Sequence, residues 1–366
     1  MSGPKARYVF LLPWSLALHG GVNTVVGGLS EAMRNRYAPY VVITGWERPP
    51  VGHHWLRLPE PARPLRSAFG FVIRFVPNLL RLRRIITGAV AVNPHFVGLE
   101  ILPLAVLRAL RLSPTLILSV HGADITLALS ASRWKRSLFA WMLSSADLVV
   151  ASSHALAAEV RLVSPKAKVV AVWNGVAPRE VDPHRPMAAP YIVCVAAFVR
   201  KKAHDVLLSA YSRIAQERPD LRLVLIGGEG PERPRVASIV HRLGLGDKVD
   251  VMVNLPNDEV WRWIRHAECF VLPSREEPFG IVLLEAAHTQ TPVVATRVGG
   301  VPEFVTDKVH GLLCEPDQPD QLAEAVLATL ADRAGAERRT RAFYEHAHQF
   351  TWSTAFDRYR SKAILP

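Results

Sequence analysis

The chain has 366 residues, of which 49% are hydrophobic and 21% are charged, a composition that excludes a disordered protein and predicts two or three globular domains. The net charge of +12 lies entirely in one half, because residues 1–185 hold 22 Lys/Arg against 9 Asp/Glu and residues 186–366 hold 22 against 23. The first half is therefore expected to face an anionic partner, such as a lipid headgroup, a phosphorylated substrate or a nucleic acid.

Short aliphatic runs alternate with helical patterns along nearly the whole chain. The runs are continuously apolar, which is typical of strands covered on both faces, and their alternation with helices predicts parallel sheets with crossover helices. Helices are predicted over Asn23–Tyr37, Ala203–Glu217 and Pro319–Arg333. The predicted strands are Tyr8–Leu12, Tyr40–Thr44, Ala89–Val92, Thr115–Ser119, Leu148–Ala151, Val169–Val172, Tyr191–Ala196, Arg222–Ile226, Val249–Val253, Cys269–Leu272, Pro292–Ala295 and Gly311–Cys314.

Four prolines between Pro178 and Pro190 form a stiff connector, after which the strand–helix pattern restarts at Tyr191. We therefore predict an α/β protein with two Rossmann-like, doubly wound domains, residues 1–185 and 186–345, that face each other across a cleft. Residues 346–366 are expected to form a C-terminal helix that packs back toward the first domain.

Cysteine usage and apolar runs bear on the compartment. The three cysteines lie far apart beside apolar runs, which indicates buried thiols in a reducing compartment. The longest membrane-span candidate, Ile101–Val120, is interrupted by two arginines and a proline. The apolar run Tyr8–Leu18 resembles a short signal peptide but contains Pro13 and Ser15. We expect a cytoplasmic protein, with peripheral attachment to the inner face of the membrane as an option.

The strongest functional signal is the segment 274–287. It combines a strand that ends at Leu272, a polar loop with Glu277, and a helix that begins near Gly280 and contains Glu285. Loops at the carboxyl ends of parallel strands bind ligands, and the free N–H groups of a first helical turn suit a sugar hydroxyl or a phosphate. No D-x-D, H-E-x-x-H, P-loop or G-x-S-x-G motif occurs, which disfavours metal-dependent transfer, zinc, Walker-type and serine-hydrolase chemistry.

Together with Thr291-Pro292-Val293-Val294-Ala295 and Gly299-Gly300-Val301-Pro302-Glu303, this segment resembles the E-x7-E region of the retaining nucleotide-sugar glycosyltransferases of family 4, which have the GT-B fold. Glu277 and Glu285 have the spacing of that motif. The resemblance implies that Glu277 approaches hydroxyls of the donor sugar and that Glu285 holds the nucleotide ribose. It places three further donor-binding residues in the same loop: Phe279, Gly280 and Ile281.

Other segments are similar to the same family. His121-Gly122-Ala123-Asp124 looks like its H-G-x-D element, whose His lies beside the transferred sugar. Gly20-Gly21-Val22-Asn23 looks like its glycine loop, whose amides approach the diphosphate and the acceptor. Gly227-Gly228-Glu229-Gly230-Pro231 resembles its G-x-G-P loop, with Gly228 at the donor, and Asn174-Gly175-Val176 looks like the turn that closes the first domain. Taken singly, a structural role is the alternative for the glycine loop and for the histidine.

The opening of the second domain departs from the family's V-G-R-L-x-x-x-K-G pattern. Lys202 keeps its place, but Ala197 and Ala203 stand where the family has Arg and Gly. Arg200 or Lys201, on the same loop, is expected to replace the missing charge.

The resemblance implies transfer of a hexose from a UDP- or GDP-linked sugar to a glycan or lipid-linked acceptor, in cell-surface polysaccharide or glycolipid synthesis, with retention and with neither a metal nor a cofactor. Without a metal, the leaving diphosphate needs fixed donors, for which Lys202, Arg200 and the amides of Gly20 and Gly21 are candidates. The expected catalytic residues are Glu277, His121 and Lys202. Alternatives are a non-catalytic, membrane-associated scaffold with a degenerate donor site, and an epimerase or phosphorylase on the same fold.

Residues 63–86 contain six arginines and no acidic residue, interleaved with aliphatic and aromatic side chains. Pro77 is expected to divide them into two short helices or a helix and a loop. This mixture suits an anionic membrane surface, with Arg81, Arg83 and Arg84 as contacts to the membrane or the acceptor; a solvated helix face packed on its own domain is the alternative. Such patches also bind single-stranded nucleic acid, but no nucleic-acid motif accompanies this one, so no nucleic acid is expected.

Overall fold

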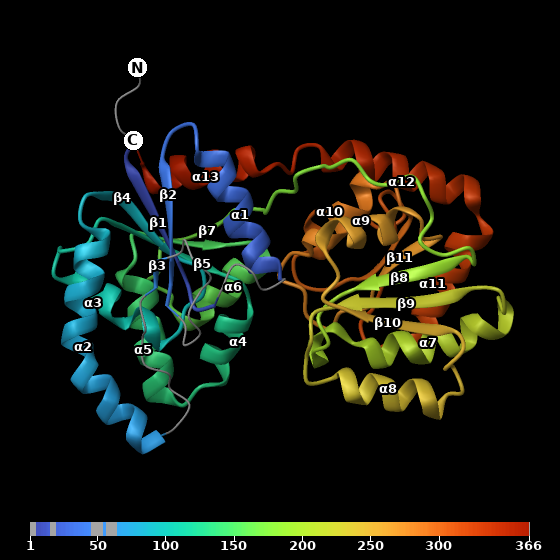
Figure 1. Cartoon of the computed structure of the whole chain (residues 1–366), viewed down its shortest axis with the longest axis horizontal. Coiled ribbons are helices and arrows are strands. Elements are labelled where there is room, and N and C mark those ends of the chain that lie inside the picture. Colours follow the sequence, from blue (N-terminus) through green and yellow to red (C-terminus); the bar gives the residue numbers. More distant parts are fainter. Residues whose placement is uncertain (1–4, 15–19, 45–53, 56–63, 366) are drawn as a thin grey trace. The chain divides into compact units, whose positions relative to one another are not determined.

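The computed structural model describes residues 5–14, 20–44, 54–55 and 64–365, with side chains for all of these except 54–55 and 64–74. The chain forms two compact units: unit 1 comprises Met1–Gly175 and Trp352–Pro366, and unit 2 comprises Val176–Thr351 (Figure 1). The first division falls before the proline-rich connector rather than at 185/186. The connector belongs to unit 2 because Arg179 binds Asp258 and because Nε of Arg262 donates to the carbonyl of His184 at 3.0 Å.

Unit 1 contains a sheet of seven parallel strands in the order β3-β2-β1-β4-β5-β6-β7 (Figure 1). Six of them confirm predicted strands, with bounds that differ by at most two residues. The seventh, β3, has two residues, too few for a hydrophobic pattern to indicate it. The strands are β1 (Arg7–Leu12), β2 (Ala38–Ile43), β3 (His54–Trp55), β4 (Ala89–Pro94), β5 (Thr115–Val120), β6 (Leu148–Ala151) and β7 (Val169–Ala171).

The helices of unit 1 cover both faces of this sheet. Aliphatic side chains of α2, α3, α5 and α6 form one core with the strands, and α1 packs with α13 on the other side. The helix bounds are α1 (Gly21–Met33), α2 (Pro64–Ile86), α3 (Leu102–Ala109), α4 (Ala123–Ser130), α5 (Arg133–Ser145), α6 (His154–Val163) and α13 (Trp352–Ala363), with the 3-10 turn η1 (Leu99–Ile101) before α3.

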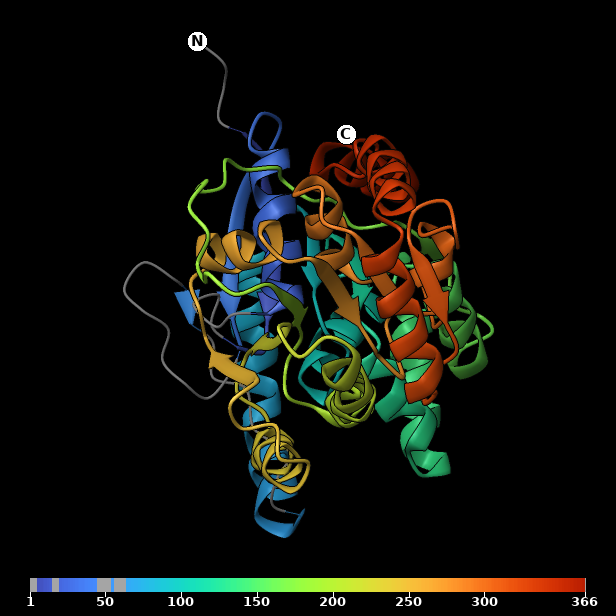
Figure 2. The same ribbon diagram turned by 90° about the vertical axis from the view of Figure 1, so that its right-hand side faces the viewer.

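Unit 2 contains six parallel strands in the order β10-β9-β8-β11-β12-β13, all of them predicted, with helices on both faces (Figure 1, Figure 2). The α/β prediction of two doubly wound parallel sheets is therefore confirmed. The strands are β8 (Tyr191–Val195), β9 (Arg222–Gly227), β10 (Val249–Val253), β11 (Cys269–Leu272), β12 (Val293–Thr296) and β13 (Leu312–Cys314). The helices are α7 (His204–Glu217), α8 (Arg233–Arg242), α9 (Asn257–Arg265), α10 (Ile281–His288), α11 (Pro319–Ala331) and α12 (Arg333–Ala347), with the 3-10 turns η2 (Arg200–Lys202) and η3 (Val301–Glu303).

The core of unit 2 lies between its sheet and α7, α8 and α11, and all three cysteines, Cys194, Cys269 and Cys314, are part of it. All three cysteines are buried free thiols, as expected from their apolar surroundings. The segment from residue 346 divides between the units, because α12 ends within unit 2 and only α13 belongs to unit 1.

The prediction that Pro77 divides residues 63–86 is wrong, because α2 is continuous from Pro64 to Ile86. Pro77 is exposed, so the helix accommodates the proline ring on its solvent-facing side. Downstream of Pro77, the buried residues Asn78, Leu82 and Ile86 hold the helix on the sheet. Within the residues described, no helix combines the length and the apolar character that a membrane span requires.

The contact of α1 with α13 depends on a glycine. A Cβ atom at Gly28 would lie 2.2 Å from the Trp352 ring, whereas a Cβ at the neighbouring Gly27 would meet nothing within 4 Å. We expect Gly28→Ala to destabilise unit 1 by about 1–3 kcal/mol through overpacking. The matched control Gly27→Ala should stabilise it by about 0.5–1 kcal/mol, because alanine favours an exposed helical position. Thermal unfolding of the two variants measures both effects, and a Gly28→Ala protein as stable as Gly27→Ala would contradict the packing argument.

Candidate active site

The strand order of unit 2 reverses between β8 and β11, which pair with each other at the centre of the sheet. At such a switch point the crossover helices leave toward opposite faces, so the loops beyond the carboxyl ends of the two strands border an uncovered space. Lys202 is the last residue of η2, in the connection between β8 and α7, and Glu277 lies in the loop after β11. Two of the predicted catalytic residues therefore come from the loops at this point.

Lys202 and Glu277 form an ion pair. Nζ of Lys202 donates a hydrogen bond to Oε2 of Glu277, and the two side chains are only 16% and 8% exposed. The hydroxyl of Ser274 donates to the same oxygen at 3.4 Å. An ammonium has three N–H donors and a carboxylate has two oxygens. Two N–H groups of Lys202 and Oε1 of Glu277 thus remain for a ligand.

Arg275 fastens these two loops together. Its backbone N–H donates to the carbonyl of Lys201 at 2.7 Å, and its Nη1 donates to the carbonyl of Arg200 at 2.9 Å. Its guanidinium also binds both oxygens of Asp205, at 3.0 and 3.1 Å, and Oδ1 of Asp317 at 2.6 Å. Burial opposes ionisation of Asp205, but the Arg275 guanidinium outweighs it and lowers the pKa of that carboxyl. Arg275 thereby positions η2, and with it Lys202.

The predicted helix start near Gly280 is confirmed. Gly280 has φ +97°, in the left-handed region that glycine adopts without strain, and α10 begins at Ile281. The N–H groups of Ile281 and Val282 lie in the first helical turn, where no intrahelical acceptor exists. They are hydrogen-bond donors next to the loop that carries Glu277.

The loop around Glu277 is anchored to the core of unit 2. The carbonyl of Glu277 accepts a hydrogen bond from the N–H of Gly300 at 3.0 Å. A Cβ at Gly299, where φ is +51°, would lie 2.1 Å from that oxygen. The Phe279 ring is 2% exposed and stacks on Phe304 with centroids 4.6 Å apart. Its side chain is thus a core group, and only its backbone is available to a donor.

Glu285, the second carboxylate of the motif, is buried on α10. Burial raises its pKa to about 7, and the Arg179 guanidinium and the Trp261 indole partly offset this effect. Arg179 itself packs over the Trp261 ring, 5.2 Å from its centroid, and binds Asp258. A protonated or shared carboxyl here suits a hydrogen bond with a ligand hydroxyl, as predicted for the ribose.

Two glycines of the predicted G-x-G-P loop are required by close approach to the loop after β8. A Cβ at Gly227 would lie 2.0 Å from the Ala196 carbonyl oxygen, and a Cβ at Gly230 would lie 2.2 Å from that of Phe198. The carbonyl of Gly228 accepts from the Phe198 N–H at 3.4 Å. Contact between Gly228 and a donor stays a prediction.

The two departures from the family pattern have different consequences. Ala203 has φ +52° and ψ +41°, so it keeps the left-handed conformation that suits the family's glycine, at a cost of about 1–2 kcal/mol for a residue with a Cβ. Ala197 is exposed and leaves an uncharged position. The Arg200 side chain is exposed and makes no hydrogen bond or ion pair with any other residue described. Its replacement of the missing arginine stays a prediction.

In unit 1 the order reverses between β1 and β4. Gly20 and Gly21 are exposed at the start of α1, beyond β1, and a Cβ at either would meet nothing within 4 Å. Packing among the described residues therefore does not require glycine at either position.

His121 follows β5 in unit 1. Asp124 is buried and accepts the backbone N–H groups of His121 and Val97 at 3.1 and 3.2 Å, while burial raises its pKa to about 6. Nε2 of His121 lies 3.2 Å from Nδ1 of His95, which follows β4. Burial lowers the pKa of His121 to about 4, so its imidazole is neutral at neutral pH. His95 thus brings a second imidazole to the predicted site.

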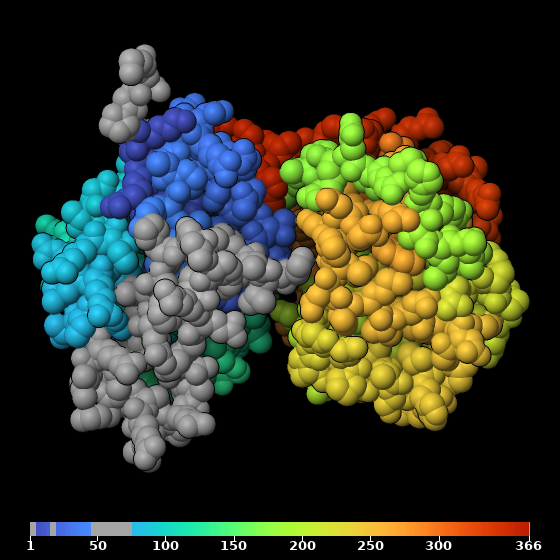
Figure 3. Space-filling model, in the orientation of Figure 1, coloured from blue at the N-terminus to red at the C-terminus, as the bar shows by residue number. Residues whose placement is uncertain are grey.

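Arg81, Arg83 and Arg84 are exposed near the end of α2. The described part of the chain around this end of α2 is cyan in Figure 3. The same helix exposes Val76 and Leu80, at 59% and 49%. Arg63 and the side chains of Arg66 and Arg74 lie outside the described residues.

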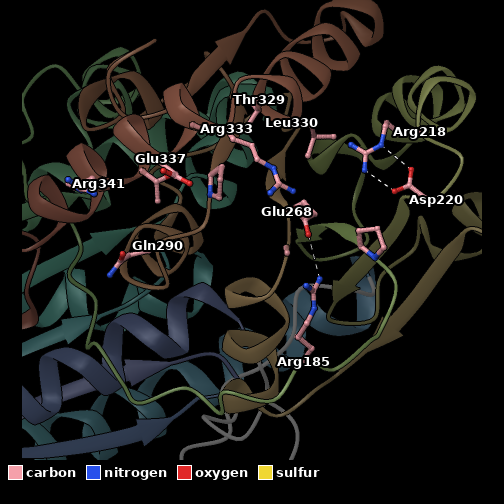
Figure 4. Close-up of a pocket in the computed structure, with 15 residues that line it drawn as sticks. Arg185, Arg218, Asp220, Glu268, Gln290, Thr329, Leu330, Arg333, Glu337 and Arg341 are labelled. Carbon is pink, nitrogen blue, oxygen red and sulfur yellow. Dashed lines mark hydrogen bonds and ion pairs between the residues drawn. The ribbon is translucent and has the colours of Figure 1, made fainter.

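A pocket of about 700 Å³ opens in unit 2 beside the amino ends of β8, β11 and β12, opposite to the strand ends that carry the predicted site (Figure 4). None of the predicted site residues lines it. Arg218 binds both oxygens of Asp220, at 2.9 and 3.0 Å, and Arg185 lies 3.5 Å from Glu268. These four charges form two pairs, and the lining also contains Arg333, Arg341 and Glu337. Among the described residues, no three His, Cys, Asp or Glu side chains are grouped to hold a metal ion.

Sequence reasoning missed Arg275, Arg179 and His95. Arg275 lies within the quoted motif, but its partner Asp205 is 70 positions away. Arg179 lies in the proline-rich connector, and no local pattern relates it to Glu285. The signal that could have found His95 is its place three residues after the predicted strand Ala89–Val92, since residues that follow a strand border the ligand-binding end of a parallel sheet.

Two family models match consecutive parts of the chain: the one described as Glycosyltransferase Family 4 matches residues 19–180, and the one described as Glycosyl transferases group 1 matches residues 180–349. The D-inositol 3-phosphate glycosyltransferase of Kribbella flavida is 38% identical over 170 residues, 43% of this chain and 40% of that protein. The enzyme of the same name from Streptomyces avermitilis is 31% identical over 238 residues, 58% of this chain and 51% of that protein. The matches thus span about half the length of these relatives.

Solved structures share the fold over the whole chain. Sucrose-phosphate synthase from Thermosynechococcus elongatus superposes with a TM-score of 0.82, 23% identity and 98% coverage of both chains. The Anabaena protein HepE, in complex with UDP and glucose, superposes with a TM-score of 0.80, 17% identity and coverage of 98% of this chain and 99% of that one. The confirmed pair of doubly wound sheets is therefore of the GT-B type.

The buried carboxyl of Glu285 predicts a pH-dependent stability. Because its pKa is raised to about 7 from an ordinary value of 4.5, the folded state binds this proton more tightly than the unfolded state does. That stabilisation is full below about pH 4.5 and is lost as pH rises through about 7. The wild type should therefore lose on the order of 2 kcal/mol of its free energy of unfolding between about pH 5 and pH 8. Glu285→Gln keeps the shape of the side chain but cannot ionise, so it should abolish this loss. Urea unfolding at both pH values measures the difference.

The control for this prediction is Glu276→Gln, because Glu276 is exposed in the neighbouring loop. It should keep the pH dependence of the wild type. The explanation fails if Glu285→Gln and Glu276→Gln lose stability equally as pH rises.

Proposed function

The chain belongs to the group 1, family 4 glycosyltransferases, and on this basis we propose that it transfers a hexose from a nucleotide diphosphate sugar to an acceptor with retention of anomeric configuration. The observation that carries the proposal is the Lys202–Glu277 pair at the switch point of unit 2. It joins a cation for the leaving diphosphate to a carboxylate for the sugar in one place.

The hydrogen-bond donors and the acceptor that the pair leaves unused have different roles in this proposal. The two remaining N–H groups of Lys202 donate to diphosphate oxygens and stabilise the negative charge that develops as the bond to the anomeric carbon breaks. Oε1 of Glu277 accepts from sugar hydroxyls, and its charge favours the positive character of the anomeric carbon. The N–H groups at the start of α10 add donors to the same anion. Glu285 holds the ribose.

UDP is the preferred nucleotide in this proposal. Structural neighbours have been solved with it, including HepE with UDP-glucose and the Staphylococcus aureus protein TarM with UDP. In this proposal Lys202, which Glu277 holds in place, and Arg200 meet the leaving charge, so we expect neither a metal nor a cofactor to take part. Same-face attack by the acceptor is the expected route to retention.

The acceptor is proposed to be lipid-linked and taken from an anionic membrane by unit 1. Besides α2, helix α5 exposes Trp134 and Trp141 at 64% and 39%. They lie seven positions apart and thus on one face of the helix. The α5 segment 133–145 has three basic residues and no acidic one. Exposed tryptophans among basic side chains suit the interface of an anionic bilayer.

A soluble phosphorylated acceptor is the second candidate. The matched relatives are named for D-inositol 3-phosphate, and the excess positive charge of residues 1–185 suits a phosphate as well as a membrane. An acceptor panel that contains both classes separates the two candidates.

The first test is turnover of radiolabelled UDP-, GDP- and ADP-sugars, with and without membranes. We expect transfer from a UDP-sugar that EDTA does not abolish. Lys202→Ala should lower kcat by about 10²–10³, the usual loss for one donor to a developing anion. Arg200→Ala should lower it by more than about tenfold if Arg200 replaces the missing arginine. A strict metal requirement, or Lys202→Ala at full rate, would count against the mechanism.

The second test concerns the membrane. A basic side chain near an anionic surface contributes about 1 kcal/mol, so neutralising Arg81, Arg83 and Arg84 to Gln should release the protein from anionic vesicles in flotation assays. Nucleotide binding should be unchanged. The matched control is the triple variant of Arg333, Arg338 and Arg341 to Gln, which removes three exposed charges from unit 2 and should still float. Wild-type protein that ignores anionic vesicles at low salt would favour the soluble acceptor.

A further inference from the structure

The loop after β4 in unit 1 carries a histidine that the proposed mechanism does not use. His95 is completely buried, and its ring lies between Phe10, at 5.5 Å between centroids, and His121. It borders the switch point of unit 1, where β4 pairs with β1. Its two ring nitrogens both have partners, Asn93 and His121. The protons on this chain of groups can therefore be assigned.

The assignment starts at Asn93, which is also completely buried. Its Nδ2 lies 2.9 Å from the Ile117 carbonyl oxygen and 3.3 Å from that of Pro94. Carbonyl oxygens only accept, so the amide nitrogen must point toward them. The Asn93 Oδ1 atom then faces the Tyr8 hydroxyl and Nε2 of His95, each at 3.1 Å.

The orientation of Asn93 determines the proton on His95. Because Oδ1 only accepts, Nε2 of His95 carries a hydrogen and donates to it. Burial lowers the pKa of His95 well below its ordinary value, and the neighbouring His121 lowers it further. The ring is therefore neutral, and its Nδ1 has no hydrogen.

The same reasoning passes to His121. Its Nε2 lies 3.2 Å from the bare Nδ1 of His95, so this Nε2 must be the donor. A neutral His121 then has a lone pair on Nδ1, which has no hydrogen-bond partner among the residues the structure describes.

We propose that His95 is a positioning residue that holds His121 as the Nε2–H tautomer, so that Nδ1 of His121 accepts a hydrogen bond from a hydroxyl of the transferred sugar. The role toward the sugar rests on the proposed function, whereas the tautomer does not. The arrangement selects a donor with a hydroxyl at the contacted carbon over one with an acceptor-only group there. It also excludes His121 Nδ1 as a proton donor to the leaving group.

The tautomer is measured directly by long-range 1H–15N correlation spectra of the full chain labelled with 15N-histidine. We expect hydrogen on Nε2 and a bare Nδ1 in both His95 and His121. Hydrogen on Nδ1 of His121 would overturn the proposal. Tyr8→Phe is the matched control, because it removes a hydrogen bond to Asn93 Oδ1 but leaves the His95 donor; it should lower the unfolding temperature without changing either tautomer.

Two variants separate positioning from general support of the fold. His95→Phe removes the acceptor for His121 Nε2 and should allow both tautomers of His121, whereas His95→Asn can keep an acceptor oxygen near the Nδ1 position and should largely preserve the single tautomer. If either protein does not fold, the wild-type spectrum and Tyr8→Phe still decide the assignment. An unchanged His121 spectrum in a folded His95→Phe protein would overturn the positioning role.

Kinetics with monodeoxy analogues of the accepted donor test the contact with the sugar. His95→Phe should lower kcat/KM by about tenfold for the parent donor, the value of one hydrogen bond, with rescue by His95→Asn. For the analogue that lacks the contacted hydroxyl, His95→Phe should change kcat/KM little, because the hydrogen bond that it weakens is already absent. An equal loss with every donor would overturn the sugar contact. A protein that shows the expected tautomer but transfers no sugar would refute the proposed function and leave the tautomer assignment standing.

Discussion

The reversal of strand order in each parallel sheet is the constraint on which the candidate site depends. Where β8 pairs with β11, and β1 with β4, the helices leave to opposite faces and the loops beyond the strands stay uncovered. The candidate site residues lie in these loops. Unit 2 carries Lys202 and Glu277 on two such loops, and unit 1 carries Gly20, Gly21 and the two histidines on loops of its own. Within each unit the loops are far apart in sequence, so each group of residues forms only because the sheet is wound this way.

The two units satisfy buried polar groups at these points in different ways. Unit 2 uses charge: the Lys202–Glu277 pair lies within a frame that Arg275 and Asp205 hold, and each ion has an opposite partner. A buried ion pair gains little stability for its desolvation, which suits a pair kept for binding an anion and a sugar. Unit 1 uses neutral groups: the hydrogen bonds of Tyr8, Asn93 and the histidines need no charge. In the proposed function, the first arrangement binds a diphosphate and the second accepts a hydrogen bond from a sugar hydroxyl.

Charge is also distributed differently over the surfaces. Many arginines of unit 2 are paired with acids, such as Arg218 with Asp220 and Arg297 with Asp307 and Glu315. In unit 1 the exposed arginines of α2 and the basic residues of α5 have few acids near them in sequence, and tryptophans and aliphatic residues are exposed beside them. This difference motivates the proposal that unit 2 binds the donor and that unit 1 binds an anionic acceptor or the membrane that carries it.

The sequence alone determined the strands and the motif loop of unit 2. Strands covered on both faces leave continuous apolar runs, and the helix start at Gly280 and the E-x7-E spacing are local patterns. The twelve predicted strands and the Glu277 loop are of this kind. Only the tertiary structure decided the rest. The clamp of Arg275 on Asp205 and the bonds of Asn93 to Ile117 join segments that no local pattern relates. The continuity of α2 through Pro77 depends on packing and solvent access rather than on propensity. The burial of Phe279 and the tautomer of His121 depend on residues that only the fold brings into contact with them. Burial and hydrogen bonding act between residues that are close in space, and the order of residues along the chain does not reveal which these are.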